Sequence, residues 1–528
     1  SDCWIDDYPG DTYIYRIRGV SVSGGNWIEL NDSSRLNSIA EGVRDEYSAW
    51  VNTFASEYSD APYELWGYSA FHFSDLSCKR TEIFDTFNTI CNLLLIMEKL
   101  RGIDIDEVYS IEIGSDICCA VESLFPGAKF KRKRVFINRW RKIRDLVSDV
   151  RFAIYTVVSI GICNFFWQKR QRRVFHPAKG YVTLFPIMNT SDNFDKKYGS
   201  LVTSKDVFYV FILTDGMHQN LAPLKFLQAI RRLKDSGNIV LVDSFISLMD
   251  VIDGIRSRFA LKRLALKKRH NRYKFQGIDV TSFIEGERRV SHRRIWRLII
   301  LGSALAKAVK ENAPKELIYY LFEYPLGRAI TAVMKTTAPT TLLSGFQHGP
   351  ASWRKLVCFI GPRMLGENGS MKDIVPIPDR IYVEDEFSKE IYLWGGYKNV
   401  FVMDKVYRLG YLETVREAGA GNNCLIAPGL NDGAILLRTI AEKISRSANV
   451  KYLLKPHPLA NNAYINEYKH IQNLEVTQAP LSELFSQVSK VYVSYSSVGA
   501  EARQLGIDVV VVDIPGVVSQ SPLQDQVA

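Results

Sequence analysis

The stretch KVYVSYSSVGAEARQLGIDVVVVDIPG, residues 490–516, contains the pattern that decides the fold. It begins with an apolar run that fits a buried strand and continues into a helical pattern from about Val498. A second apolar run follows from Asp508. A strand, a helix and a second strand in succession are typical of a parallel α/β sheet. The run VVVVD, residues 509–513, is apolar on both faces, which predicts a central strand.

The same alternation extends over most of the chain. In the C-terminal part, further strands are expected at residues 423–429, 450–457 and 474–478. In the middle part, they are expected at residues 181–186, 207–215, 238–245, 317–323, 340–349 and 380–385. This pattern predicts an α/β fold with two facing Rossmann-like domains, parallel doubly wound sheets and an interdomain cleft.

We place the N-terminal domain at residues 1–375, with a basic and apolar insertion near 129–173, and the C-terminal domain at 376–528. The length of 528 residues and the hydrophobic content of 47% are sufficient for two or three packed cores. The first 125 residues either extend the N-terminal domain or form a separate unit.

The composition also narrows the cellular location. Eight cysteines occur without CxxC spacing, which favours a reduced, cytosolic protein without structural zinc. The formal charge of +10 is concentrated in two basic runs, at residues 129–144 and 261–274. The first run is followed by an apolar stretch, residues 152–167, and then by QKRQRR.

That apolar stretch is 16 residues long, short of the roughly 20 that span a bilayer. It is either a core helix or a segment that lies on the membrane, with basic residues against anionic head groups. We therefore expect a cytoplasmic protein that is peripheral on the inner face of the cell membrane through segment 129–173. Nucleic acid is not expected as a partner, because no nucleic-acid-binding module is recognisable.

Polar residues follow two of the expected C-terminal strands. Lys455 and His457 follow one, and Ser496 and Ser497 follow a strand that we expect to be its neighbour. A cation, an imidazole, hydroxyls and the free N–H groups of a helix N-terminus together suit a phosphate. Helix capping alone would also explain the serines.

The facing domain has its own polar strand ends. Glu323 ends one strand, and Gln347 and His348 end the next, with Gly349 permitting a turn. An acid, an amide and an imidazole on adjacent strands are the parts of an acid/base site. The alternative for Glu323 is an ion pair with Arg328.

Asp215, in the segment ILTDGMHQN with His218 close by, is a second strand-end acid, although Asp-Gly is also a common turn. Neither GxGxxG nor GxxxxGK[ST] is present, which removes the usual support for a dinucleotide or P-loop NTPase site.

The chain also resembles a known family of enzymes. The two Rossmann-like domains, KPHP and SYSSVGAEA resemble GT-B glycosyltransferases that use CMP-activated sugars, such as bacterial sialyltransferases and Kdo transferases. The resemblance covers roughly residues 180–515. It implies that the His-Pro and Ser-Ser motifs bind the CMP phosphate and nucleotide. With their neighbours, the residues assigned to this nucleotide site are Gly429, Lys455, His457, Pro458, Ser494, Ser496, Ser497 and Glu501.

The resemblance also implies a reaction. A 2-keto sugar acid, either Kdo or a nonulosonic (sialic-like) acid, would pass from its CMP donor to a lipid-linked acceptor in bacterial capsule or O-antigen assembly. No cofactor and no metal are expected. The catalytic candidates are Glu323, His348 and Asp215, and Arg328, Gln347 and Gly349 would contact the donor sugar or acceptor. Tyr324 and Pro325 stand where the capsule Kdo transferases have Asp-Gly.

Other activities fit the same architecture. They are a CDP-glycerol or CDP-ribitol phosphotransferase, a UDP-sugar transferase or epimerase, and a non-catalytic binding scaffold. GT-B chains usually continue into a helix that crosses back to the first domain, so we expect further sequence after residue 528.

Overall fold

The protein is described by a computed structural model. It describes residues 3–4, 11–17, 22–23, 27–58, 63–111, 114–133, 141–167, 178–184, 196–201, 208–213, 223–233, 238–267, 271–361, 374–447, 449–458, 460 and 462–525.

The first domain is built on a seven-stranded parallel sheet with the order β11-β10-β9-β14-β15-β16-β17. Its strands are β9 (Lys179–Leu184), β10 (Phe208–Leu213), β11 (Ile239–Leu241), β14 (Glu316–Tyr320), β15 (Leu342–Phe346), β16 (Arg380–Val383) and β17 (Val400–Val402). The order reverses between β9 and β14, so the switch point lies where these two strands meet. Helices pack against the sheet, which explains why the strands read as apolar runs.

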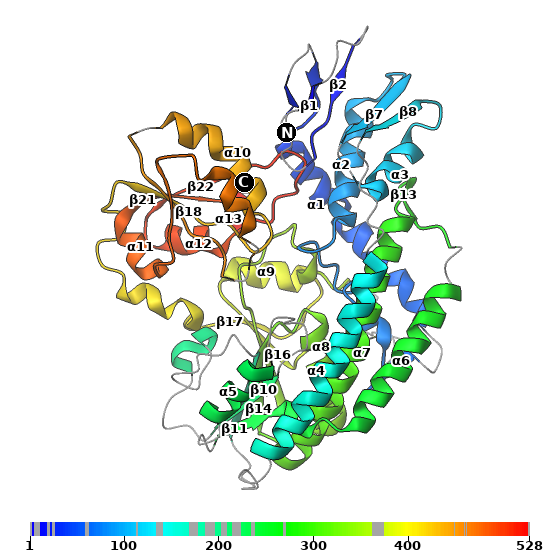
Figure 1. Ribbon diagram of the computed structural model, residues 1–528, viewed down its shortest axis with the longest axis vertical. Coiled ribbons are helices and arrows are strands. Elements are labelled where there is room, and N and C mark those ends of the chain that lie inside the picture. The colour runs from blue at the N-terminus through cyan, green and yellow to red at the C-terminus, as the bar shows by residue number, and fades with distance from the viewer. Residues whose placement is uncertain are drawn as a thin grey trace.

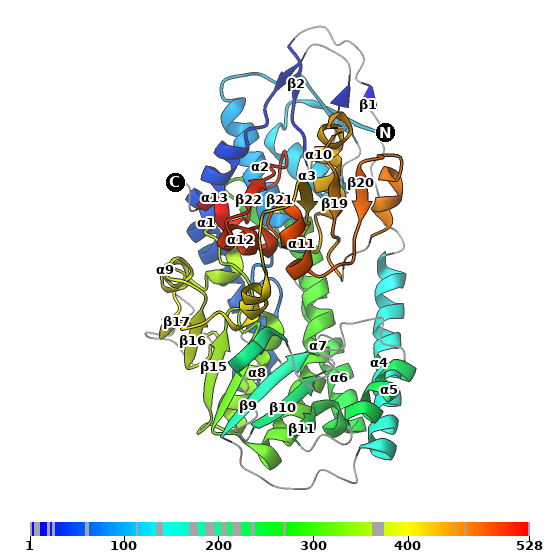
Figure 2. The ribbon, with the colours of Figure 1, turned by 90° about the vertical axis from the view of Figure 1, so that its left-hand side faces the viewer.

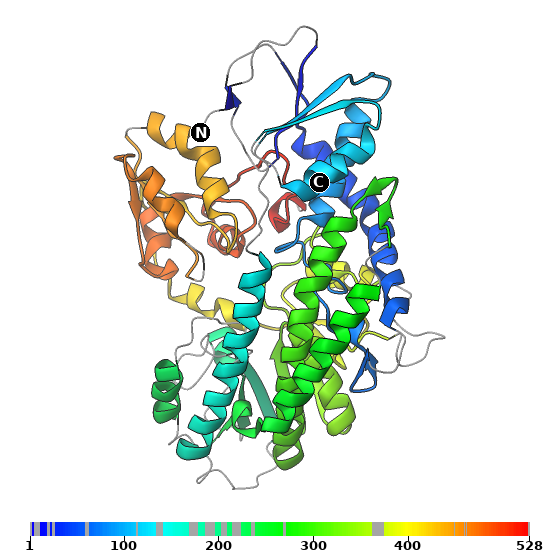
Figure 3. The same ribbon diagram turned by 45° about the vertical axis from the view of Figure 1, so that its right-hand side comes forward.

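Long helices cover the first domain. They are α4 (Arg141–Phe166), α5 (Pro223–Leu233), α6 (Leu248–Lys267), α7 (Thr281–Asn312), α8 (Pro325–Thr337) and α9 (Glu386–Trp394). Helices α4, α7 and α6 lie side by side along one flank of the molecule (Figure 1, Figure 3).

The N-terminal residues extend this domain. They form α1 (Ser33–Asn52), α2 (Thr86–Lys99), α3 (Ser115–Leu124) and the parallel pair β7 (Glu107–Ile111) and β8 (Lys129–Lys133). Leu36 of α1, Ile90 of α2 and Leu317 of β14 belong to one buried apolar cluster. Strand β8 is formed by the first residues of the basic run 129–144.

The second domain holds a five-stranded parallel sheet with the order β20-β19-β18-β21-β22. Its strands are β18 (Asn423–Ile426), β19 (Tyr452–Leu454), β20 (Leu474–Val476), β21 (Val488–Val493) and β22 (Asp508–Val511). Its helices are α10 (Gly433–Arg446), α11 (Leu481–Gln487), α12 (Ser497–Gln504) and α13 (Pro522–Asp525). Figure 2 shows this sheet above the seven-stranded one.

Both sheets have the Rossmann order, so the predicted α/β fold with two Rossmann-like domains and parallel sheets is confirmed. Three details differ from the predictions. The expected boundary at residues 375 and 376 falls inside the first sheet, because β16 and β17 pair into it. Strand β18 lies between β19 and β21, so the two polar strand ends are not on neighbouring strands. Strand β22 is an edge strand rather than a central one.

The apolar character of β22 has a different cause from the one expected. Val509 and Val511 pack against the apolar cluster on one face of the sheet, and Val510 and Val512 pack against the cluster on the other. An edge strand that is covered on both faces therefore reads like a central one.

After β22 the chain returns to the first domain. The carbonyl oxygen of Gly516 accepts hydrogen bonds from Asn88 and Asn92, at 3.0 Å each. Arg354 of the first domain donates to the carbonyl oxygen of Ser519 at 2.6 Å and pairs with Asp525 of α13. Residues 512–525 therefore connect the second domain back to the first.

The turn from β14 into α8 leaves no room for a side chain at Gly327. A Cβ atom there would overlap the carbonyl oxygen of Leu321, a non-glycine residue with a φ of 65°. We expect Gly327→Ala to lower the free energy of unfolding by roughly 1–3 kcal/mol, because backbone would have to move.

The matched control is Gly286→Ala within α7, where a Cβ atom would meet nothing within 4 Å. That change should raise stability by up to about 1 kcal/mol, since alanine favours a helix over glycine. Chemical denaturation of both variants checks the pair. Equal effects of the two substitutions would contradict the close contact at Gly327.

Candidate active site between the two domains

A cavity of about 360 Å³ lies between the second sheet and the N-terminal part of the first domain. Three loops of the second domain line it, after β18, β21 and β22, at the carboxyl edge of the sheet. Because the strand order reverses between β18 and β21, the cavity lies at the switch point of the sheet, where Rossmann-like domains bind ligands. Residues 81–88 and Arg354 form the opposite wall.

Asp432 is the buried acid of the second domain's wall, at 4% exposure. It occupies the N-cap position of α10 without a side-chain capping bond, and Ser494 at the end of β21 donates a hydrogen bond to its Oδ2. The other oxygen, Oδ1, is buried without a well-aligned hydrogen-bond partner. Burial raises the pKa of Asp432, while the bond from Ser494 acts in the opposite direction. Gly429 leaves room for the ring of Tyr495, which contacts the position of its absent Cβ.

Glu82 is the corresponding acid on the first domain's wall. Its Oε1 accepts a hydrogen bond of 2.7 Å from the hydroxyl of Tyr324, which follows β14. Its Oε2 is buried and has no hydrogen bond, with Arg80 Nε at 3.9 Å. Its backbone oxygen accepts a 3.0 Å bond from the amide of Asn431 in the second domain. Glu82 is thus held where the two domains meet, and its Oε2 pairs with Arg80 without forming a hydrogen bond.

The lining of this cavity is acidic and rich in hydroxyl and amide groups. Its polar residues are Thr81, Glu82, Asp85, Asn88, Arg354, Asn431, Asp432, Ser494, Tyr495, Asp513, Ser519 and Gln520. Arg354, the cation of this set, is already paired with Glu41 and Asp525. Carboxylates, amides and hydroxyls bind the hydroxyl groups of a sugar, whereas a phosphate would meet several negative charges here.

A smaller cavity lies at the carboxyl edge of the first sheet. Tyr320, Gln347 and His348 line it together with Tyr407 and Arg408. The ring of His348 packs against that of Tyr324, with centroids 5.4 Å apart. Tyr324 also binds Glu82, so it contacts one lining residue of each cavity.

The residues predicted to bind the nucleotide share the carboxyl edge of the second sheet, but they do not form one cluster in the described structure. The Lys455 amine donates to the carbonyl oxygen of Ala479 at 2.7 Å, and burial lowers its pKa. Pro458 is exposed and His457 is partly exposed. Of the predicted set, Ser494 lines the large cavity and Gly429 contacts its Tyr495.

The two serines at the start of α12, Ser496 and Ser497, make different contacts. Ser496 occupies the N-cap position without a side-chain capping bond, and Ser497 donates to Glu501 at 3.0 Å. Glu501 also pairs with Arg408 at 3.0 Å and accepts a bond from Tyr411. Its carboxylate is therefore engaged in contacts between the domains.

The predicted catalytic acid, Glu323, is buried at 2% exposure and lines neither cavity. Tyr392 of α9 donates a hydrogen bond to it, and burial raises its pKa. Its place after β14 is as predicted, but its side chain contacts α9 in the interior.

The expected ion pair of Glu323 with Arg328 is not formed. Arg328 instead donates to Ser77 at 2.9 Å and to the carbonyl oxygen of His72 at 3.2 Å. Gln347 is buried and bonded to Ser388, and a Cβ at Gly349 would meet open space. Asp215 and His218 lie outside the described residues.

Sequence reasoning missed Glu82, Asp432 and Tyr495. Asp432 follows the apolar strand in NCLIAPGLND, so its place after a strand was a signal. Glu82 lies in a segment without strand character, and the sequence contains no comparable sign for it. In the described residues, no group of three or more His, Cys, Asp or Glu side chains is arranged to hold a metal ion.

No family model and no curated protein matches this chain. Solved structures that are similar to it include a UDP-N-acetylglucosamine 2-epimerase, at 11% identity and a TM-score of 0.35, covering 64% of this chain and 79% of the other. A UDP-N-acetylglucosamine 2-epimerase from Rickettsia bellii has 10% identity and a TM-score of 0.32, covering 64% and 80%.

The glycotransferase of kitacinnamycin has 12% identity and a TM-score of 0.34, covering 67% of this chain and 84% of the other. None of these three descriptions names a CMP-sugar enzyme. At such low identity the likeness concerns the fold, so the chemistry of the cavity has to be inferred from the residues that line it.

Proposed function

We propose that this protein is a glycosyltransferase that moves a sugar from a nucleotide-activated donor to a hydroxyl group of a glycan acceptor. One observation carries the proposal. Glu82 and Asp432, from opposite walls of the interdomain cavity, each have a buried carboxylate oxygen without a well-aligned hydrogen-bond partner. Such oxygens are expected to bind hydroxyl groups of a sugar, since a buried acceptor that stays unpaired is unfavourable.

In this proposal Glu82 is the general base. Its Oε2, which has no hydrogen bond and lies 3.9 Å from Arg80, would take the proton of the acceptor hydroxyl, while Tyr324 holds Oε1 in place. The acceptor oxygen then forms a bond to the anomeric carbon, and the bond from that carbon to the leaving phosphate breaks. The electron pair leaves with the nucleotide. Direct displacement of this kind inverts the configuration at the anomeric carbon.

The proposed donor is a CMP-activated 2-keto sugar acid, of the Kdo or sialic type, and the acceptor is a lipid-linked glycan of a bacterial surface polysaccharide. The support is the sequence resemblance at His457, Pro458, Ser496 and Ser497. These residues lie at the same carboxyl edge as the cavity but outside its lining. The phosphate would therefore lie beside the acidic cavity and the acceptor sugar within it.

A nucleotide panel tests the donor. CMP, CDP, UMP, UDP, GDP and ADP are titrated into the protein by calorimetry, with thermal shift as a second readout. We expect selective binding of CMP. His457→Ala should weaken CMP binding about 10- to 100-fold, because one hydrogen bond to a charged phosphate is lost.

The alternatives give different results in the same panel. Selective UDP binding would contradict the CMP donor and favour a UDP-sugar transferase or epimerase. Binding of none of the nucleotides would favour a scaffold without turnover. CMP binding that His457→Ala leaves unchanged would keep the donor but contradict the proposed phosphate contact.

A further inference from the structure

Helix α4 presents a stripe of large apolar side chains to the solvent, while its inner face buries Phe152 and Cys163 beside the polar Thr156 and Ser159. Its exposed large apolar residues recur at helical spacing, so that they form one stripe along the helix. They are Ile143, Leu146, Val147, Val150, Ile154, Val157, Val158 and Phe165, and Phe166 at the end of the helix is also exposed. Leu146 is 65% exposed and Phe165 is 88% exposed. A core helix would have the opposite arrangement, so this stripe needs a partner outside the described chain.

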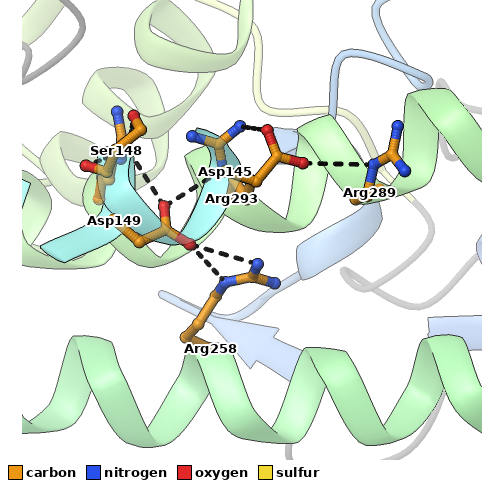
Figure 4. A network of polar contacts seen from close by, with 7 residues as sticks. Asp145, Ser148, Asp149, Arg258, Arg289 and Arg293 are labelled. Atoms are coloured by element: carbon orange, nitrogen blue, oxygen red, sulfur yellow. Dashed lines mark hydrogen bonds and ion pairs between the residues drawn. The ribbon is translucent and has the colours of Figure 1, made fainter. Parts of the chain in front are cut away.

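The inner face of α4 is held by charge rather than by apolar packing alone. Asp145 and Asp149 point toward arginines of α6 and α7 (Figure 4). Arg293 lies 2.6 Å from Asp145 and 3.2 Å from Asp149, and Arg258 lies 3.3 Å from Asp149. Both acids of α4 are thus neutralised inside the protein, away from the apolar stripe.

Helix α6 also exposes apolar side chains, although it buries Val251, Leu261 and Leu264 in the core. Its exposed apolar residues are Leu248, Met249, Ile252, Ile255, Phe259 and Leu266. Its exposed cations are Arg256, Lys262, Arg263 and Lys267. Asp253 is an exposed acid of α6, and Arg256 lies 3.2 Å from it. We call the exposed apolar residues of α4 and α6, together with these cations and the exposed Arg144 and Arg151 of α4, the α4–α6 face.

We propose that the α4–α6 face binds the surface of an anionic phospholipid membrane, with both helices lying in the plane of the interface. Apolar side chains flanked by cations are the pattern of an interfacial helix, since the first enter the acyl boundary and the second meet anionic head groups. Of the segment 129–173 that the sequence predicts at the membrane, this proposal keeps α4, adds α6 and leaves out Lys129–Lys133, which forms β8.

Two other occupants fit the charges less well. A second copy of the chain on the same face would bring two sets of arginines and lysines together, which is repulsive. The stretch Ile143–Phe166 of α4 is, by length and composition, long and apolar enough to cross a membrane. As a span, however, it would carry Asp145, Asp149 and their arginine partners into the hydrocarbon, which is unfavourable.

Vesicle co-sedimentation of the full chain tests this proposal without any substrate, so its outcome is independent of the proposed reaction. The vesicles are phosphatidylcholine alone, and phosphatidylcholine with about 30% phosphatidylglycerol, which supplies the anionic surface. We expect the parent protein to bind the anionic vesicles more tightly. Combined Val150→Glu and Ile154→Glu should weaken that binding at least about tenfold, since two charges would enter the apolar boundary.

Two further variants test the contribution of the cations of α6 and the effect of a new charge elsewhere on the surface. Lys262→Glu with Arg263→Glu should weaken binding to the anionic vesicles and have little effect on phosphatidylcholine alone. Leu393→Glu, on α9 and 49% exposed, is the matched control and should bind like the parent. Circular dichroism checks that all variants are folded.

Three results would overturn the proposal. The first is a parent protein that binds neither type of vesicle. The second is equal binding by the parent and the Val150→Glu, Ile154→Glu variant. The third is a parent that is dimeric in gel filtration, becomes monomeric with that variant and binds no vesicles, which would assign the face to a second copy of the chain.

Discussion

Glu82→Gln is expected to lower kcat for glycosyl transfer about 10²- to 10⁴-fold, the usual effect of removing a general base. The glutamine carbonyl can still accept the hydrogen bond from Tyr324, so the fold and the cavity should be retained. The substitution replaces the oxygen that would take the acceptor proton with an amide nitrogen, which is not basic. Because the acceptor hydroxyl can still be bound, most of the loss should fall on kcat rather than on KM.

The matched control is Glu323→Gln, which changes the acid that the sequence resemblance favours. Glu323 is bonded to Tyr392 and lines neither cavity, so turnover should stay within a few-fold of the parent. Rates measured with a labelled donor, together with melting temperatures, distinguish the two variants. If Glu82→Gln turned over normally while Glu323→Gln were folded but inactive, Glu323 would be the catalytic base.

The strands could be predicted from the sequence, whereas their order could not. Each strand of a parallel sheet is buried on both faces, and its apolar run stands out from the polar turns around it. The position of a strand in the sheet depends on which edge each crossover takes, which leaves no mark in a single strand. For this reason β19 and β21 were expected to be neighbours, and β22 was expected to be central.

Only part of the candidate site could be predicted, because the sequence shows where strands end but not where the side chains at those ends point. Ser494 and Gly429 were assigned to the nucleotide site, and in the structure Ser494 lines the cavity while Gly429 contacts the ring of its Tyr495. A strand end does not determine where the side chain points, and Glu323 points into the interior toward Tyr392. Glu82 lies before α2, more than 200 residues before β14, and only the fold brings it to Tyr324.

The second large effect is expected at Arg408, which joins the two domains. Its guanidinium group lies 2.7 Å from Glu384 Oε2, after β16 of the first domain, and 3.0 Å from Glu501 Oε1, in α12 of the second. All three side chains are largely buried, and the two acids raise the pKa of Arg408 although burial alone would lower it. The arginine therefore stays charged throughout the pH range in which the protein is folded.

Arg408→Met should lower the free energy of unfolding by about 3–5 kcal/mol, because two buried carboxylates lose their counter-charge. The matched control is Lys405→Met, which removes an ion pair of 2.7 Å with Glu413 at the exposed surface. That change should lower stability by less than about 1 kcal/mol, since exposed pairs are screened by water. Urea denaturation of both variants measures the difference.

The loss of Arg408 also removes a contact between the two domains. Glu384 and Glu501 belong to different domains, so the loss of the bridge removes a bond between the two units as well as stability within them. Adding Glu384→Gln to Arg408→Met should restore part of the stability, because one of the unpaired charges is removed. If Arg408→Met were no less stable than Lys405→Met, the buried bridge would not hold the domains, and the crossing segment at Gly516 and Asp525 would have to supply that connection.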